Sequence, residues 1–179
     1  MMFTALAIMF AVGLTAAVVS NRLNRHRIDE LESARALARK RLQSVSAGHD
    51  VEEVLAQSGV VPSDFERARR VIEVIPRTFG LENLVPPADL VLGDVMRVHV
   101  PVNVGVKDGR SSGESRLMDP FTYDLIANLL AVTDKNLWAQ HTEVDSTLPH
   151  DEEALGELIA GMTVAGFVQL FTPLVKAKR

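Results

Sequence analysis

The pattern of apolar and polar positions separates an uncharged opening run from a longer remainder with helical periodicity. Residues 1–20 contain no charged side chain, and a helix of about 20 apolar residues is what crosses a bilayer core roughly 30 Å thick. We therefore predict a transmembrane anchor over residues 1–21. A cleaved signal peptide and a buried soluble helix are the alternatives, but a signal peptide normally begins with basic residues, and none precedes this run.

Three arginines follow the apolar run directly, namely Arg22, Arg25 and Arg27. An excess of basic residues beside a membrane helix marks its cytoplasmic side. The pattern predicts a single-pass protein with its N-terminus outside and its C-terminal domain in the cytoplasm. The same guanidinium groups could contact anionic headgroups at the membrane surface.

Residues 22–48 form a basic juxtamembrane segment, which we predict to be a helical stalk. From about residue 28 to 47 it lacks Gly and Pro and is rich in strong helix formers. Its apolar stripe is interrupted by Arg35 and is shorter than three clean heptads. A homo-oligomer formed through residues 28–45, and with it an oligomeric membrane scaffold, is the alternative. The stripe consists of Ile28, Leu31, Ala38, Leu42 and Val45.

Residues 49–179 are predicted to form one mainly α-helical cytoplasmic domain. Asp50 and Ser63 each stand three residues before a Glu, the spacing of a helix-opening capping box. The second of these helices carries apolar residues at helical intervals as far as Phe79. Pro76 predicts a kink or an early end there, and Gly80 a stop.

The second half of this domain shows three further helix openings. Asp119 as cap and Pro120 at the first helical position predict a helix that runs to about Gln140 and is the most buried of the domain. A shorter helix begins in the acidic segment 149–154, and a last one is capped by Thr163.

A valine-rich segment within residues 97–118 alternates with polar positions, which predicts a strand. No second valine-rich run exists to pair with it, and an unpaired edge invites a second chain. We predict that an unidentified protein binds through this segment, unless it packs across its own domain. Trp138 could anchor a partner or line a pocket, although it more often closes a core. The partner-binding candidates are Val98, Val100, Val102, Val104 and Trp138.

The order of these elements resembles the acyl carrier protein fold, a small four-helix bundle. The stretch "FGLENLVPPADLVLGDV" is similar to the end of that family's first helix and the loop after it, and "PHDEEA" and "TVAGFV" are similar to its later "PDEEA" and "TVGDLV". The resemblance covers about residues 64–175, with an insertion at about 97–118. It implies that the apolar residues of the loop tuck under the helices.

The chain departs from the family at the attachment point of the phosphopantetheine arm. The family carries that arm on the Ser of Asp-Ser-Leu, whereas the corresponding triplet here is Asp119, Pro120 and Phe121, and proline has no hydroxyl. The resemblance therefore implies the scaffold without the prosthetic group and without any other cofactor. A working carrier, modified at a displaced hydroxyl, is the alternative. The candidates for that attachment are Ser111, Ser112, Ser115 and Thr122.

Charge and cysteine content exclude several functions. The chain has no Cys, which rules out disulfides, thiolate metal sites and cysteine nucleophiles. Residues 22–41 hold seven of the 19 Lys and Arg and three of the 23 Asp and Glu, which leaves 12 basic against 20 acidic residues beyond them. An acidic body is a poor ligand for nucleic acid, because phosphate binding needs a basic face.

Enzymatic motifs are weak. No Ser, His and Asp set or phosphate-binding glycine pattern stands at a recognisable spacing. Two small groups could hold a metal ion, but polar loops and acidic first turns explain them better. These groups are His141 with Glu143 and Asp145, and His150 with Asp151 and Glu152. We predict that the protein is not an enzyme and has no metal, and that it is a membrane-tethered, acyl carrier-like interaction module.

Overall fold

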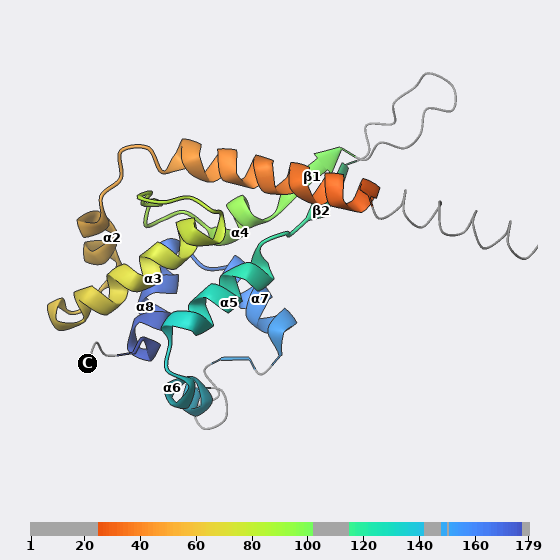
Figure 1. Ribbon diagram of the computed structural model, residues 1–179. Coiled ribbons are helices and arrows are strands. Elements are labelled where there is room, and N and C mark those ends of the chain that lie inside the picture. The colour runs from red at the N-terminus through yellow and green to blue at the C-terminus, as the bar shows by residue number, and fades with distance from the viewer. Residues whose placement is uncertain (1–24, 102–114, 142–147, 150, 177–179) are drawn as a thin grey trace, which may run out of the picture. The chain divides into compact units, whose positions relative to one another are not determined.

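The computed structural model describes residues 25–101, 115–141, 148–149 and 151–176 (Figure 1). Its contacts divide the chain into two compact units, Met1–Ser33 and Ala34–Arg179. The described part is mainly helical, as predicted, with one two-stranded sheet. No helix in this part is long and apolar enough to cross a membrane. The predicted anchor over residues 1–21 and Arg22 lie outside the described residues.

A helix occupies residues 25–45, close to the predicted bounds. Within the first unit its side chains are largely exposed, and His26 Nδ1 lies 3.2 Å from Glu30 Oε1 one turn later. From Ala34 onward the helix belongs to the second unit, where Ala34, Ala38 and Leu42 are fully buried at intervals of four residues. This half is therefore part of the compact body. This half is not a free stalk, and Ala38 and Leu42 of the predicted stripe are buried in the body, whereas Ile28 is exposed.

Arg35, which interrupts the apolar stripe, is an anchor between this helix and the start of α5 (Thr122–Val132). Its Nη2 donates to Asp124 Oδ2 at 3.0 Å, and its guanidinium lies 5.7 Å from the ring centre of Phe121. A guanidinium over an aromatic face is attracted by the ring quadrupole, which stabilises this contact. The break in the periodicity thus marks a contact and not a solvent-facing position.

Two helices, α2 (Val51–Ser58) and α3 (Phe65–Thr78), follow. Asp50 Oδ1 accepts from the amide of Glu52 at 3.5 Å, which confirms the first predicted cap. The second is wrong, because the 3-10 turn η1 (Pro62–Asp64) moves the cap position from Ser63 to Asp64. Pro suits the first position of a helical turn, where its missing N–H costs nothing.

Helix α3 ends two residues after Pro76, close to the predicted end. The Pro76 carbonyl accepts from the amides of Phe79 at 3.0 Å and Leu81 at 2.9 Å, which satisfies an acceptor at the helix end. Gly80 has φ +67°, a left-handed conformation that glycine adopts without strain. The chain therefore turns sharply and folds back beside α3.

The long loop after α3 is structural, as expected, and contains the short helix α4 (Leu92–Met96). Leu92 and Val95 are fully buried, whereas Leu84, Val85, Leu90 and Val91 are only partly buried. The backbone of this loop pairs with the start of α8 (Val164–Phe171). The amide of Leu92 donates to the carbonyl of Met162, and the amide of Val164 donates to the carbonyl of Leu90, each at 2.9 Å.

Strand β1 (Val98–Pro101) pairs antiparallel with β2 (Ser115–Met118), so that Val98 faces Met118 and Pro101 faces Ser115. The prediction that the valine strand lacks a partner is wrong, because the partner Ser-Arg-Leu-Met has no valine pattern to reveal it. Val98 and Val100 are only 2% and 4% exposed. As buried core residues they offer no surface to a second chain, which corrects their assignment as partner-binding residues.

The predicted helix from Pro120 to Gln140 is two helices, α5 (Thr122–Val132) and α6 (Lys135–Ala139). The break at Thr133 has two causes. Thr133 forms an isolated bridge with Val175, and the amide of Asp134 donates to Leu174 O at 2.7 Å. Asp134 then caps α6 through its carboxylate. Helix α5 buries one face only, since Leu130 is 42% exposed.

The last two helices begin in the predicted segments, and the predicted cap Thr163 is confirmed. Asp151 accepts from the amide of Ala154 at 2.7 Å before α7 (Glu152–Ala160), and Thr163 accepts from the amide of Gly166 at 3.1 Å before α8. A 3-10 turn, η3 (Thr172–Leu174), follows α8. Helix α3 packs against α2, α5 and α8 (Figure 1). The largest fully buried side chains of the body are Phe79, Phe121, Phe167 and Phe171.

The burial of residues 34–45 in the body predicts that Leu42→Ala lowers the free energy of unfolding by about 2 to 5 kcal/mol, the usual loss for a fully buried leucine. Leu37→Ala, on the exposed side of the same helix, is the matched control and should change it by less than about 1 kcal/mol. Urea unfolding of the full chain in a mild detergent measures both. Equal effects of the two substitutions would contradict this packing.

Candidate functional site

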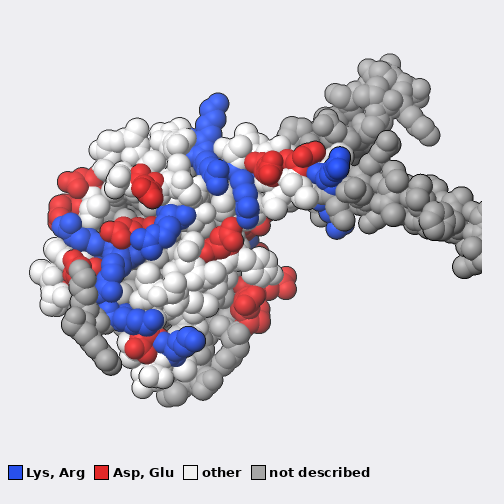
Figure 2. Space-filling view, in the orientation of Figure 1, with Lys and Arg blue, Asp and Glu red and all other residues white. Residues whose placement is uncertain are grey.

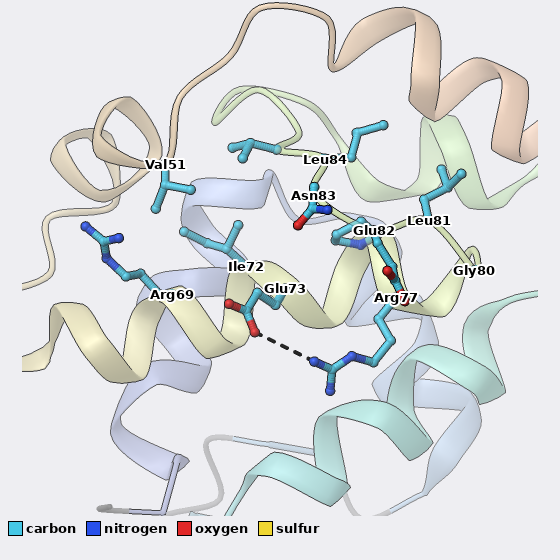
Figure 3. Close-up of a pocket in the computed structure, with 12 residues that line it drawn as sticks. Val51, Arg69, Ile72, Glu73, Arg77, Gly80, Leu81, Glu82, Asn83 and Leu84 are labelled. Atoms are coloured by element: carbon cyan, nitrogen blue, oxygen red, sulfur yellow. Dashed lines mark ion pairs between the residues drawn. The ribbon is translucent and has the colours of Figure 1, made fainter.

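A surface pocket of about 520 Å³ lies beside the C-terminal half of α3 (Figure 3). Helix α3 forms one side, the loop 80–85 forms the other, and the first residue of α2 closes one end. The lining residues are Val51, Arg69, Ile72, Glu73, Pro76, Arg77, Gly80, Leu81, Glu82, Asn83, Leu84 and Val85.

The pocket exists because the chain reverses direction immediately after α3. Gly80 and Asn83 both adopt positive φ, +67° and +55°, and Asn tolerates this region better than most residues with a side chain. The reversal brings Leu84 and Val85 back toward Ile72, which is buried in the core. Half of the lining is therefore apolar and is continuous with the body.

The charged side chains of the lining are partly paired with one another. Arg77 Nη2 lies 3.7 Å from Glu73 Oε2, and both side chains are more than half exposed (Figure 3). Arg69 is paired with Glu52 of α2. Exposed pairs of this kind contribute about 0 to 1 kcal/mol, so a ligand can replace them at little cost. Glu82 has no ion pair or hydrogen bond with another described residue.

A cation of the first helix lies beside Gly80, although it is not among the lining residues. Arg39 Nη2 lies 3.3 Å from the position that a Cβ on Gly80 would occupy, and Gly80 lines the pocket. Arg39 is exposed and has no ion pair or hydrogen bond within the described part of the chain. On the face that Figure 2 shows, basic side chains form a connected band, with a few acidic side chains beside it.

The predicted attachment candidate Thr122 lies at another place, the start of α5. Its hydroxyl donates to Asp119 Oδ2 at 2.5 Å, and Asp119 Oδ1 accepts from the amides of Phe121 and Thr122 at 3.3 and 3.0 Å. Asp119 thus accepts from the first amides of the helix as predicted, but α5 begins at Thr122 with Phe121 at the cap position, so Pro120 is not its first residue. A Cβ on Gly156 would lie 2.6 Å from the Thr122 methyl group, so Thr122 is held between its cap and α7.

The other attachment candidates are in the inserted segment. Ser115 begins β2, while Ser111 and Ser112 lie outside the described residues.

Arg97 joins the elements around this cap. Its Nη2 lies 2.5 Å from Glu157 Oε1 on α7, and its Nε lies 3.7 Å from Asp119 Oδ2. The hydrogen bond with Glu157 raises the pKa of Arg97, and the same bond lowers the pKa of Glu157. Arg41 donates to the carbonyl of Asp94 at 2.6 Å, beside the end of α4. This network ties α4, α5 and α7 together, which is a structural role.

The remaining candidates do not converge on a site. Trp138 is partly buried and stacks on Phe171 with ring centres 5.9 Å apart, which indicates a core role. Arg25 and Arg27 are exposed. Val102, Val104, Glu143, Asp145 and His150 lie outside the described residues. Among the residues that are described, no group of three His, Asp or Glu could hold a metal ion.

The sequence did not predict the pocket, because the loop after α3 was expected only to tuck its apolar residues under the helices. The available signal was weak: a proline near a helix end, then Gly80 and Asn83 within four residues. The contribution of Val51 had no sequence signal, because it comes from a different helix. Comparison with protein-family models, with curated proteins and with solved structures finds no match for the chain.

The Arg97 network predicts a pH dependence of stability that Glu157 controls. Because the pKa of Glu157 is lowered in the folded state, Glu157 contributes fully to stability at pH values above the ordinary pKa of about 4.3. This contribution to stability is lost as the pH falls through the lowered pKa. We expect Glu157→Gln to lose less stability than the parent on acidification from about pH 6 to about pH 3. The free energy of urea unfolding measures this.

Glu153→Gln is the control, since Glu153 is exposed on the same helix. If both substitutions leave the pH dependence of the free energy of unfolding as it is in the parent, the ion pair of Glu157 with Arg97 makes no contribution to stability.

Proposed function

We propose that this protein is a membrane-tethered, non-enzymatic binding module whose binding site is the pocket beside α3. In this proposal residues 1–21 span the bilayer, Arg22, Arg25 and Arg27 hold their C-terminal side in the cytoplasm, and the helical body presents the pocket there. The observation that carries the binding part is the pocket itself, which is half apolar and has replaceable ion pairs on its rim.

The dimensions and chemistry of the pocket support a small-molecule or chain-like ligand. Ligand pockets are typically about 300 to 1,000 Å³ and combine an apolar lining with a few polar groups, and this pocket is about 520 Å³. Ile72, Leu84 and Val85 can bury an apolar group against the edge of the core. The rim can then orient whatever polar end the ligand carries.

The identity of the lining residues supports binding in place of catalysis. None of the residues lining this pocket carries a hydroxyl, thiol or imidazole group, and these groups are the usual nucleophiles and proton carriers. Glu73 is paired with Arg77, so its carboxylate is engaged as a structural partner. The carrier-like part of the proposal is supported by the order of α3, α5, α7 and α8.

The tethered topology predicts a labelling pattern that the cysteine-free chain makes simple to read. A short tag that carries one cysteine, fused before residue 1, should react with a membrane-impermeant maleimide in intact cells, whereas Glu153→Cys on α7 should react only after the membrane is permeabilised. Replacing Arg22, Arg25 and Arg27 together by Gln should weaken this asymmetry, because basic residues set the orientation. Labelling of Glu153→Cys in intact cells would refute the proposed orientation.

Filling the pocket should abolish binding without unfolding the body. Hexanol, a short soluble apolar probe, should shift the methyl NMR signals of Ile72, Leu84 and Val85 in the full chain. Leu84→Trp should reduce the affinity for hexanol at least about tenfold, because the indole ring occupies the apolar part of the pocket. Leu130→Trp, on an exposed position of α5, is the control. No shift of the pocket methyls at any hexanol concentration below denaturation would refute a binding site here.

A further inference from the structure

We infer that the pocket beside α3 binds an extended peptide segment of a partner protein. The backbone of that segment pairs with the loop residues 81–85, and one of its aliphatic side chains enters the apolar part of the pocket. This inference rests on the proposed binding function and names the chemical class of the ligand. It follows from the backbone of the loop, from one polar side chain and from the apolar residues beside them.

The loop residues 81–85, which line the pocket, have an almost entirely unpaired backbone. The amides of residues 82–85 and the carbonyls of residues 81–85 make no hydrogen bond with any residue that the structure describes. The later part of the same loop differs, since the carbonyl of Ala88 accepts from the amide of Ala165 at 2.8 Å. A continuous row of free backbone donors and acceptors therefore borders the pocket.

The sequence holds the end of this row in an extended conformation. Val85 precedes Pro86, and Pro86 precedes Pro87. A residue before proline is disfavoured in the helical region and adopts an extended backbone. Residues 84–87 belong to no helix, turn or strand. An extended backbone with free donors and acceptors is the element to which a peptide adds as a further strand.

Asn83 supplies a side chain with matching chemistry. It lines the pocket, and in Figure 3 its carboxamide points from the loop toward α3. This carboxamide makes no hydrogen bond with another described residue. A primary amide carries donors and an acceptor side by side. It can therefore donate to the carbonyl of a peptide and accept from one of its amides.

The apolar part of the pocket suits one aliphatic side chain. Ile72 is buried in the core, and Val51 and Val85 pack against that core. All three line the pocket, and none of them has a hydrogen-bonding side chain. A peptide with an aliphatic residue at its centre fills this space while its backbone lies along the loop.

The same features select a peptide over a plain alkyl chain. An alkyl chain would cover the free backbone groups and the carboxamide of Asn83 without offering them a partner. Removing polar groups from water without a new hydrogen bond is unfavourable. A peptide has a donor and an acceptor in nearly every residue, so it pairs these groups and fills the apolar space together.

Three capped pentapeptides test this inference with the full chain in a nonionic maltoside detergent. The parent peptide is acetyl-Ala-Ala-Leu-Ala-Ala-amide, and the other two are methylated on the amide nitrogen of the leucine or of the alanine after it. Alternate residues of an added strand bond to its neighbour. We therefore expect one methylation to weaken binding at least about tenfold and the other to change it by less than about threefold.

Amide exchange distinguishes strand addition from simple filling of the pocket. The parent peptide should shift the methyl NMR signals of Ile72 and Val85 and slow hydrogen exchange of the Leu84 or Val85 amide at least about tenfold, because a paired amide is protected. Hexanol should shift the same methyl signals and leave the exchange of both amides unchanged.

Asn83→Gly tests the carboxamide without straining the loop, because glycine adopts the left-handed backbone of this position freely. It should weaken binding of the parent peptide at least about tenfold and change the affinity for hexanol by less than about threefold. Asp89→Gly is the matched control, since Asp89 is exposed in the same loop and does not line the pocket. It should leave both affinities unchanged.

The outcomes separate this inference from the proposed function. The peptide is overturned, while the pocket stands as a binding site, if hexanol binds and the parent peptide does not. It is also overturned if the parent peptide binds without protecting either amide, if both methylated peptides bind as tightly as the parent, or if Asn83→Gly leaves peptide binding unchanged. Binding of neither hexanol nor the parent peptide overturns the proposed function itself.

Discussion

The contact between Phe79 and Phe121 is the interaction on which the rest of the body depends. Their ring centres lie 4.3 Å apart, and both side chains are almost completely buried. Phe79 ends α3 and Phe121 precedes α5, while Arg35 of the first helix covers Phe121 from outside. A buried aromatic pair adds about 0.5 to 1.5 kcal/mol beyond the area that it removes from water. Three segments distant in sequence therefore meet at one point.

This junction also positions the pocket. Because Phe79 is held in the core, Gly80 must turn outward directly after it, and the loop that follows closes over α3. The arginines of the first helix divide into two kinds as a result. Arg35 and Arg41 form contacts with α5 and with the end of α4, whereas the guanidinium of Arg39 lies beside Gly80. The same helix thus contacts both the start of α5 and the turn after α3.

Local signals predicted the helix beginnings well. Asp50, Asp119, Asp151 and Thr163 all accept backbone amide bonds, because a cap requires only a side-chain oxygen two or three residues before its donor. The prediction of Ser63 as a cap was wrong because a 3-10 turn begins at Pro62 and moves the cap position to Asp64. Signals that depend on distant residues were not readable. The break at Thr133 comes from Val175, and the strand partner of Val98 has no β pattern.

The apolar periodicity, the caps and the end of α3 near Pro76 were encoded within a few neighbouring residues, so sequence reasoning could recover them, together with the mainly helical class of the body. The pairing of β1 with β2, the packing of residues 34–45 and the pocket were decided only by tertiary structure. Each depends on which surfaces meet after folding. Arg39 shows the reason most directly, since its neighbour Gly80 lies on another element and no local rule connects the two positions.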